Sequence, residues 1–334
     1  MRKLFLIIIV VAGLGDRLRA QDPIFSQFYA TPLQLNPAFA GSGIAPRMGA
    51  AYRNQWSGFN NAYRTFGLFY EQPLLRLNSG IGFSLESDDA GQGIYKTNRF
   101  HAVYAYNLRL REDVAIKFGM EAGFYQNSLD WSKLLFPDQI DALGGISINT
   151  DEIAPELNGR VRLDMGAGML LLGDRFHAGF SLKHINTPND ALLLTNDNLG
   201  RGLPIRYTVQ GGFELYVKKG NKNQVGSFIS PNFLFVSQGP YRQLNVGAFV
   251  SAGFFYGGAW YRHTFRNVDA AIFTVGFQQG VVKVGLSYDA AISGLSGRSG
   301  STFELTTGIL LDKSERLRER NKRSRTKECP RMFQ

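Results

Sequence analysis

The sequence predicts an all-β protein: a transmembrane antiparallel β-barrel of about 14 strands, with a short non-strand N-terminal lead-in and a basic C-terminal tail. Three observations predict this fold. Apolar and polar residues alternate in segments of ten or more residues, short turns alternate with longer loops, and no uncharged apolar stretch of about 18 residues follows residue 20. The third observation excludes a protein that crosses the membrane with helices, because a spanning helix needs about 20 apolar residues.

The alternation is clear between Ile205 and Val217. The odd positions there are apolar or glycine, whereas the even positions include Arg206, Gln210 and Glu214. Successive strand residues point to opposite faces, so one face suits lipid and the other suits a polar lumen. Segments of this length fit the roughly 9 to 11 residues with which a tilted strand crosses a bilayer.

The same pattern along the whole chain gives fourteen strands. They are expected at residues 44–56, 62–73, 79–87, 98–110, 113–129, 157–172, 174–187, 203–217, 224–236, 242–255, 257–265, 269–279, 281–292 and 301–311. The odd-numbered connections are the longer ones, such as 88–97 and 130–156, and most even-numbered ones are tight, including Tyr256 and Gly280 alone. This asymmetry is typical of outer-membrane barrels. The even strand count places both termini on the short-turn side, expected to be the periplasm, with the long loops outside the cell. A secreted all-β sandwich or propeller is the alternative.

The chain divides into four parts. Residues 1–20 have a basic start and an apolar run, Leu4 to Leu14, before a plausible cleavage point after Ala20, which predicts a secretory signal peptide. Residues 21–43 are expected to be a periplasmic lead-in, because prolines at 23, 32 and 37 interrupt any strand. Residues 44–312 are the predicted outer-membrane barrel, and residues 313–334 a basic periplasmic tail.

The net charge of +10 lies mostly at the two ends of the sequence. Residues 1–20 hold four bases and one acid, and residues 313–334 hold nine bases and three acids, which leaves +1 for the residues between. The tail segment Glu315 to Lys327 lacks the aromatic residues that stack on bases, so nucleic acid is not expected as a partner. A tether to an acidic partner or to the membrane surface is the preferred interpretation.

No motif for catalysis, a metal or a cofactor is found. The four histidines are His101 and His177, with the parity of lumen residues, and His184 and His263, with the parity of lipid-facing neighbours. None has the spacing of a zinc site. The single cysteine, Cys329, excludes an internal disulfide. A barrel hydrolase that used His101 or His177 with a serine such as Ser181 is the enzymatic alternative, but no nucleophile motif supports it.

The predicted lumen carries charges of both signs, among them Arg99, Asp164, Arg206 and Glu304. Such residues can line a water channel or pair into a network that closes it. The N-terminal segment or a folded loop could fill the bore, and the sequence leaves the open and the plugged lumen as alternatives.

Two sequence stretches carry a resemblance to a known family. The residues in these stretches are Gln21, Asp22, Pro23, Phe25, Ser26, Gln27, Asn36 and Pro37, followed by Tyr52, Arg53, Asn54, Gln55 and Trp56. With Ser287-Tyr288-Asp289 and Cys329-Pro330-Arg331, these residues make the chain similar to the PorP/SprF family of type IX secretion and gliding motility.

The resemblance implies an outer-membrane protein that works with the components of the type IX machinery. Its implied partners are a secreted adhesin with a C-terminal sorting domain, a periplasmic peptidoglycan-binding protein or lipoprotein, and outer-membrane lipid. The implied function is to assist export of such adhesins, to anchor them at the surface, or both. A channel or transporter for small or hydrophobic solutes is the alternative function.

The longest predicted outer loop, Asp130 to Glu156, is the expected contact surface for a partner. Its apolar residues Trp131, Leu134, Leu135 and Phe136 are of the type that dominates protein interfaces. The alternative is that these four residues only pack over the mouth of the barrel.

Overall fold

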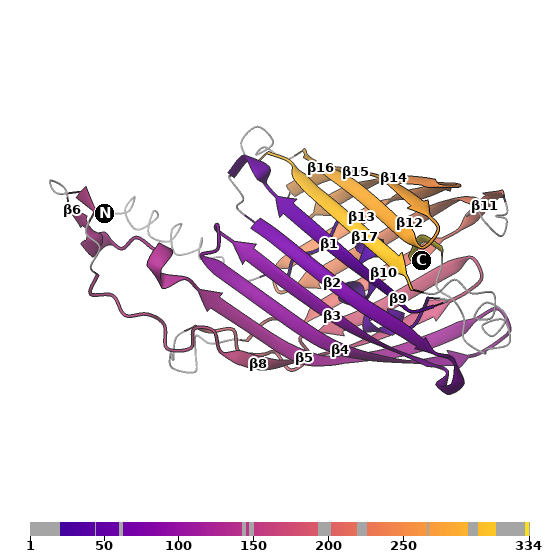
Figure 1. The fold of residues 1–334 in the computed structure, drawn as a ribbon, viewed down its shortest axis with the longest axis horizontal. Helices are drawn as coiled ribbons and strands as arrows, with labels where there is room; N and C mark the ends of the chain where they lie inside the picture. Colours follow the sequence, from indigo (N-terminus) through magenta and orange to yellow (C-terminus); the bar gives the residue numbers. More distant parts are fainter. Residues whose placement is uncertain are drawn as a thin grey trace, which may run out of the picture.

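A computed structural model describes residues 21–43, 45–59, 63–141, 145–146, 150–192, 202–218, 226–265, 267–292, 300–311 and 331–333. Its main element is an antiparallel sheet that closes on itself (Figure 1). The strands are β1 (Arg47–Gln55), β2 (Tyr63–Leu74), β3 (Ser79–Ala90), β4 (Tyr95–Arg109), β5 (Ala115–Leu129), β8 (Val161–Leu172), β9 (Phe176–Lys183), β10 (Arg206–Phe213), β11 (Leu215–Lys218), β12 (Ser227–Gln238), β13 (Tyr241–Ala252), β14 (Phe255–Thr264), β15 (Asn267–Gln279), β16 (Val282–Ala291) and β17 (Thr302–Leu310).

The sheet closes because β1 pairs with β17, from Arg47 opposite Leu310 to Asn54 opposite Phe303. Both β10 and β11 pair with β12 and follow each other across Glu214, so they form one strand of the wall. Within the described residues the barrel therefore has fourteen strands, which confirms the predicted fold class. Closure leaves no unpaired sheet edge, as a barrel in lipid requires.

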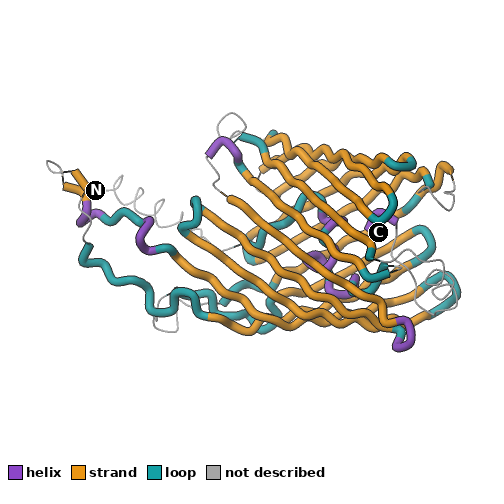
Figure 2. The backbone as a smooth tube through the Cα atoms, in the orientation of Figure 1, coloured by secondary structure: helices purple, strands orange, loops and turns teal. Residues whose placement is uncertain are grey.

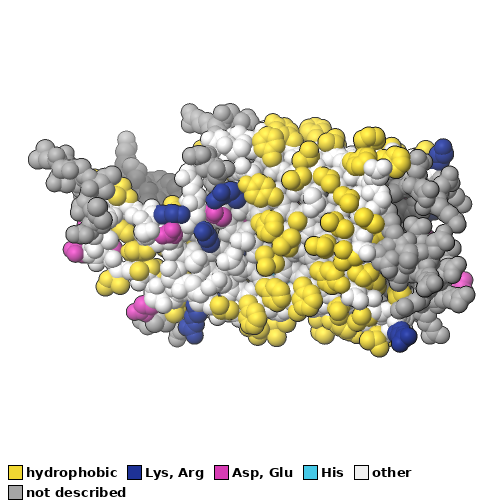
Figure 3. Space-filling view, in the orientation of Figure 1, with side chains coloured by type: hydrophobic (Ala, Val, Ile, Leu, Met, Phe, Trp, Pro, Cys, Tyr) yellow, Lys and Arg dark blue, Asp and Glu magenta, His cyan; other side chains and the backbone are white. Residues whose placement is uncertain are grey.

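The alternating pattern sets which side chains face out. Along β4, Phe100, Tyr104 and Tyr106 are exposed, while His101 and Asn107, at positions of the opposite parity, are buried: His101 follows Phe100 and Asn107 follows Tyr106. Figure 3 shows apolar side chains as a broad band over the barrel, with the charged side chains of this face lying toward its ends. A protein surface of this kind matches the hydrocarbon layer of a bilayer.

The two ends of the barrel differ. We call the end where β5 passes into residues 130–160 the loop end, and the end where β1 begins and β17 ends the turn end. Loop-end segments include η3 (Ser57–Phe59), η5 (Trp131–Lys133), η6 (Pro137–Gln139) and the small hairpin of β6 (Ile140–Asp141) and β7 (Gly145–Ile146), whereas η4 (Leu75–Leu77) lies at the turn end. None of the helices in the described ranges is long and apolar enough to span a membrane.

Several predicted boundaries were wrong. Tyr256 is not a turn, because β13 ends at Ala252 and the chain reverses at Gly253, whose φ of +71° favours glycine. Tyr256 instead points inward, and its ring stacks on Phe249. Residues 88–97 are mostly strand, since only positions 91–94 separate β3 from β4.

The interior is filled by the two ends of the described chain. The lead-in forms η1 (Phe28–Ala30), α2 (Pro32–Leu35) and η2 (Pro37–Phe39), and the last described residues form η7 (Arg331–Phe333). These short helices lie inside the ring of strands (Figure 2). The predicted non-strand character of the lead-in is confirmed, but its residues lie within the barrel and not in the periplasm beside it. The predicted tail lies outside the described residues except for 331–333, which are also inside the barrel.

Candidate functional site: the plugged lumen

The lead-in runs through the lumen from the loop end to the turn end. At the loop end, the backbone N–H of Asp22 donates to the side chain of Gln238, the last residue of β12, at 2.9 Å. At the turn end, Gly41 lies so close to Gly80, near the start of β3, that a Cβ on either residue would meet backbone atoms. Residue 21 therefore lies toward the loop end, although the first and last barrel strands have their outer termini at the turn end.

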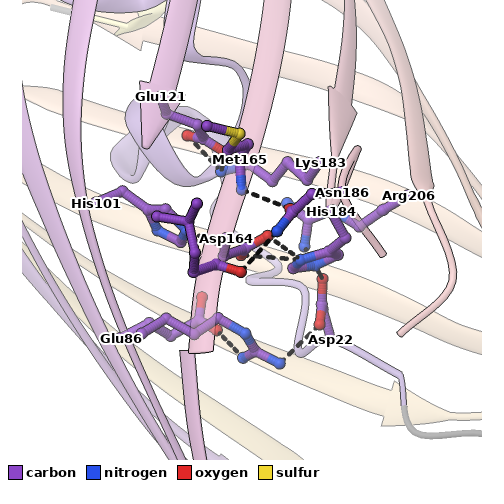
Figure 4. Close-up of polar contacts among 12 residues, drawn as sticks. Asp22, Glu86, His101, Glu121, Asp164, Met165, Lys183, His184, Asn186 and Arg206 are labelled. Carbon is purple, nitrogen blue, oxygen red and sulfur yellow. Dashed lines mark hydrogen bonds and ion pairs between the residues drawn. The ribbon is translucent and has the colours of Figure 1, made fainter. Parts of the chain in front are cut away.

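Asp22 fixes the loop end of the lead-in through three basic side chains of the wall. Its carboxylate lies 2.7 Å from Arg99, 2.6 Å from His184 and 3.2 Å from Arg206 (Figure 4). The four residues are each at most 8% exposed. A buried carboxylate costs a large desolvation energy unless it is paired, so these contacts tie Asp22 to one position in the lumen.

The network around Asp22 extends along the wall. Arg99 also pairs with Glu86 at 2.6 Å, and the second ring nitrogen of His184 lies 2.9 Å from Asp164. Asp164 in turn accepts from His101 at 3.0 Å. The inward-facing charges of the wall are thus bound to one another and to the lead-in.

His184 corrects the prediction that it faces lipid. Strand β9 ends at Lys183, and His184 has a φ of +58°, which turns the chain inward and breaks the alternation. Its side chain is 1% exposed. His101 and His177 are buried on the lumen side as predicted, and His263 is half-buried beside Tyr261 and Phe265.

A second polar cluster binds the lead-in at Ser26 and Gln27. Their backbone N–H groups donate to the two carboxylate oxygens of Glu304, at 2.8 and 2.7 Å. The Ser26 hydroxyl donates to Asp289 at 2.6 Å, and Arg53 pairs with Glu304 at 3.2 Å. Arg262 lies 2.9 Å from Asp289 and completes the charge balance of the cluster. Backbone donors and a carboxylate form strong, directional bonds when water is excluded.

Aromatic packing holds the middle of the lead-in. The Tyr29 ring stacks on Trp260, with centroids 5.7 Å apart, and meets Phe249 edge-on at 5.2 Å. Phe28 meets Trp260 edge-on at 6.3 Å. Tyr29 is 1% exposed. Aromatic pairs of this kind stabilise a contact beyond the burial of their area.

Asn36 and Lys117 fix the second half of the lead-in. The Asn36 amide donates to the carbonyl oxygens of Met169 and Phe180, both at 3.1 Å, and its oxygen accepts from the N–H of Ala38. Lys117, on β5, donates at 2.8 Å to the carbonyl of Ala40 and to Ser42. The lead-in is therefore bonded to the wall along its whole length.

The family-motif residues have three different environments. Asp22, Phe25, Ser26, Gln27, Asn36, Pro37 and Arg53 are buried in the lumen, Pro23, Asn54 and Gln55 are half-buried, and Gln21, Tyr52 and Trp56 are exposed. The motif is thus mainly the lead-in together with one wall residue that binds it. Sequence reasoning missed this relation and also missed Glu304 and Asp289 as its partners.

The predicted contact residues of the long loop lie apart from the plugged lumen. Figure 1 shows this segment, with η5 and η6, leaving the end of β5 and extending away from the barrel. Trp131 and Phe136 pack on each other with ring centroids 4.6 Å apart, and Leu135 is 53% exposed. Leu134 is half-buried.

Within the described part of the chain, no group of three or more His, Cys, Asp or Glu side chains could hold a metal ion. The lead-in contacts the wall through ion pairs, hydrogen bonds and aromatic packing.

These features define an outer-membrane β-barrel whose lumen is occupied by its own chain. The sequence model for the type IX secretion system membrane protein PorP/SprF matches residues 18–309, nearly the whole chain, so this protein belongs to that family. The family and the fold are those of a secretion-system membrane protein and not of an enzyme class. The resemblance predicted from the motif residues is confirmed.

Solved structures share the general barrel form at low identity. Omp33 of Acinetobacter baumannii aligns with a TM-score of 0.45 and 8% identity, over 81% of this chain and 100% of that one. The CymD monoaromatic hydrocarbon channel aligns with a TM-score of 0.46 and 11% identity, over 87% of this chain and 93% of that one. No curated protein matches the sequence.

Proposed function

We propose that this barrel is a closed scaffold that assists export of secreted adhesins with a C-terminal sorting domain, anchors them at the surface, or does both. The observation that supports this over a solute channel is the lead-in, which fills the lumen and is bonded to the wall at Asp22, Ser26, Asn36 and Ala40. A water-filled channel for small solutes needs a free path along its axis, and a transporter with a plugged lumen must move its plug before a solute can pass.

The docking surface in this proposal is the arm, which we define as residues 130–156. Leu135, Ile140 and Ile153 are exposed by 53%, 57% and 83%. Asp138 accepts from Thr150 and from the backbone N–H of Asp151, both at 2.8 Å, which holds the two limbs of the arm together. Exposed apolar residues on a preformed support are typical of a protein-binding surface.

Replacing Leu135 and Ile153 together by glutamate is expected to lower the amount of adhesin on the cell surface by roughly tenfold or more, because two apolar anchors are lost. Surface adhesin is measured by antibody binding to intact cells. The control is Leu77→Glu, which changes a residue that is 63% exposed at the turn end and is expected to have no effect. Normal surface adhesin in the double variant, with a folded barrel, would show that the arm is not the dock.

The arm is proposed to face the outside of the cell, and the turn end is proposed to face the periplasm and its peptidoglycan-binding or lipoprotein partner. In a Cys329→Ser background, a membrane-impermeant maleimide should label Ile153→Cys on intact cells. It should label Leu77→Cys only after the outer membrane is breached. The opposite labelling pattern would mean that the turn end faces the outside of the cell and that the arm is not the docking surface.

A further inference from the structure

The turn end of the lumen holds a short piece of chain that the site described above does not use. Residues Arg331–Phe333 form η7 there, and Met332 and Phe333 are 0% and 1% exposed. They lie outside the part of the chain that the family model matches, which ends at residue 309.

The Phe333 side chain sits between the lead-in and the wall. Its ring stacks on Phe39 of the lead-in, with centroids 4.6 Å apart and planes at 27°. The ring of His177, on β9, meets it edge-on at 5.0 Å and 84°. A buried aromatic ring held from two sides in this way contributes both burial and ring-to-ring attraction.

The backbone of the same residues is held by charged side chains of the wall. The N–H of Met332 donates to Glu214 at 3.2 Å, and Lys283 donates to the carbonyl of Met332 at 3.1 Å. Arg47, which pairs with Glu71, donates to the carbonyl of Phe333.

Two of these wall residues are themselves fixed in place. Glu214 is the residue at which the strand formed by β10 and β11 is interrupted, and it is 1% exposed. The Lys283 ammonium lies 5.2 to 5.8 Å from the ring centroids of Tyr29, Phe249 and Tyr256. Donors and acceptors on rigid strands that converge on a peptide backbone form a peptide-binding site.

We propose that the turn end of the lumen is a peptide-binding site for a short aromatic segment, and that Arg331–Phe333 occupies it as a latch that retains the lead-in. The latch contacts the lead-in through Phe39. It contacts the wall through Glu214, Lys283 and Arg47. The lead-in therefore cannot leave toward the turn end unless the latch is displaced first. The inference does not depend on whether the arm binds an adhesin.

A photo-crosslinking experiment tests the position of the latch in the purified full-length mature protein. Benzoylphenylalanine at position 333 keeps an aromatic ring and should crosslink to the segments that contain Phe39 and His177, identified by mass spectrometry of the digest. The same group at Phe255, which is 67% exposed on the outer surface, should not crosslink to either segment. Absence of both crosslinks from position 333 would overturn the proposal.

Conductance in planar bilayers tests the retaining role. Phe333→Ala should raise the fraction of time that the barrel conducts by roughly ten- to a hundredfold, since it removes a fully buried ring. Phe333→Leu should have a smaller effect, and Phe255→Ala should behave as the unchanged protein. A heat-dependent gel shift confirms that each variant is folded. If folded Phe333→Ala conducts no more than Phe255→Ala, the tripeptide does not retain the lead-in.

Discussion

Replacing Asp22 with asparagine is expected to destabilise the folded protein by about 3 to 5 kcal/mol, because the buried guanidinium of Arg206 would lose its counter-ion. The carboxylate of Asp22 is shared by Arg99, His184 and Arg206 at distances of 3.2 Å or less. Arg99 and His184 keep a second acidic partner, but Arg206 has Asp22 as its only ion-pair partner in the described residues. Stability is measured by the heat-dependent gel shift in detergent. The temperature at which the band of the folded barrel disappears should be clearly lower for the variant.

The control for this prediction is Asp130→Asn at the base of the arm. The Asp130 side chain is 39% exposed and pairs with Lys133 at 3.4 Å, so water replaces the lost contact and the transition temperature is expected to stay unchanged. Asp22→Glu, which keeps the charge but displaces it, should fall between the two. Equal transition temperatures for Asp22→Asn and Asp130→Asn would mean that the lead-in is not held through its carboxylate.

The strands could be predicted because their pattern is local. Alternation has a period of two residues. The sequence of each wall strand therefore shows which of its residues point inward, as in β4 and β10. The even strand count followed from the same alternation, and the non-strand lead-in followed from its three prolines. Both predictions depended only on residues that are neighbours in the sequence.

The plug could not be predicted because its contacts are distant along the chain. The bond from the Ser26 N–H to Glu304 joins residues 278 positions apart, and nothing near either residue signals the other. Proline excluded a strand at residues 21–43 but did not indicate that the segment enters the lumen. One available signal was the family motif, which combines lead-in residues with the inward-facing Arg53.

Extrapolation of a strand beyond its last ladder bond produced the error at His184. His184 follows β9 by one residue, and the alternating pattern assigned it to lipid, whereas its positive φ brings it to Asp22. Positive φ is uncommon for residues other than glycine, and it is stabilised here by the contacts of His184 with Asp22 and Asp164. A residue that breaks the alternation at a strand end can therefore take part in the site, as His184 does.

Gly119→Val is expected to open the lumen. Gly119 is on the inner face of β5, and a Cβ there would meet the backbone of Pro37 and Ala38 in η2. Backbone atoms of a short helix cannot rotate away as a side chain can, and overpacking of this kind costs about 1 to 3 kcal/mol or more. Valine should push η2 from the wall. It should thereby weaken the bonds of Asn36 to the wall carbonyls and the bonds of Lys117 to Ala40 and Ser42. The open fraction in planar bilayers should rise by roughly tenfold or more.

Met120→Val is the matched control, because it introduces the same residue one position later on the same strand. Met120 is 65% exposed on the outer face, so the change leaves the lumen untouched. The unchanged protein and Met120→Val should both conduct rarely, and only Gly119→Val should form a lasting pore. A steady conductance already present in the unchanged protein would favour the solute channel over the closed scaffold, because the lead-in would then leave a free path beside it. If the Gly119→Val variant is folded by the heat-dependent gel shift but does not conduct, η2 can shift without opening the lumen. The contacts that keep the lumen closed would then be those of the clusters at Asp22 and Glu304.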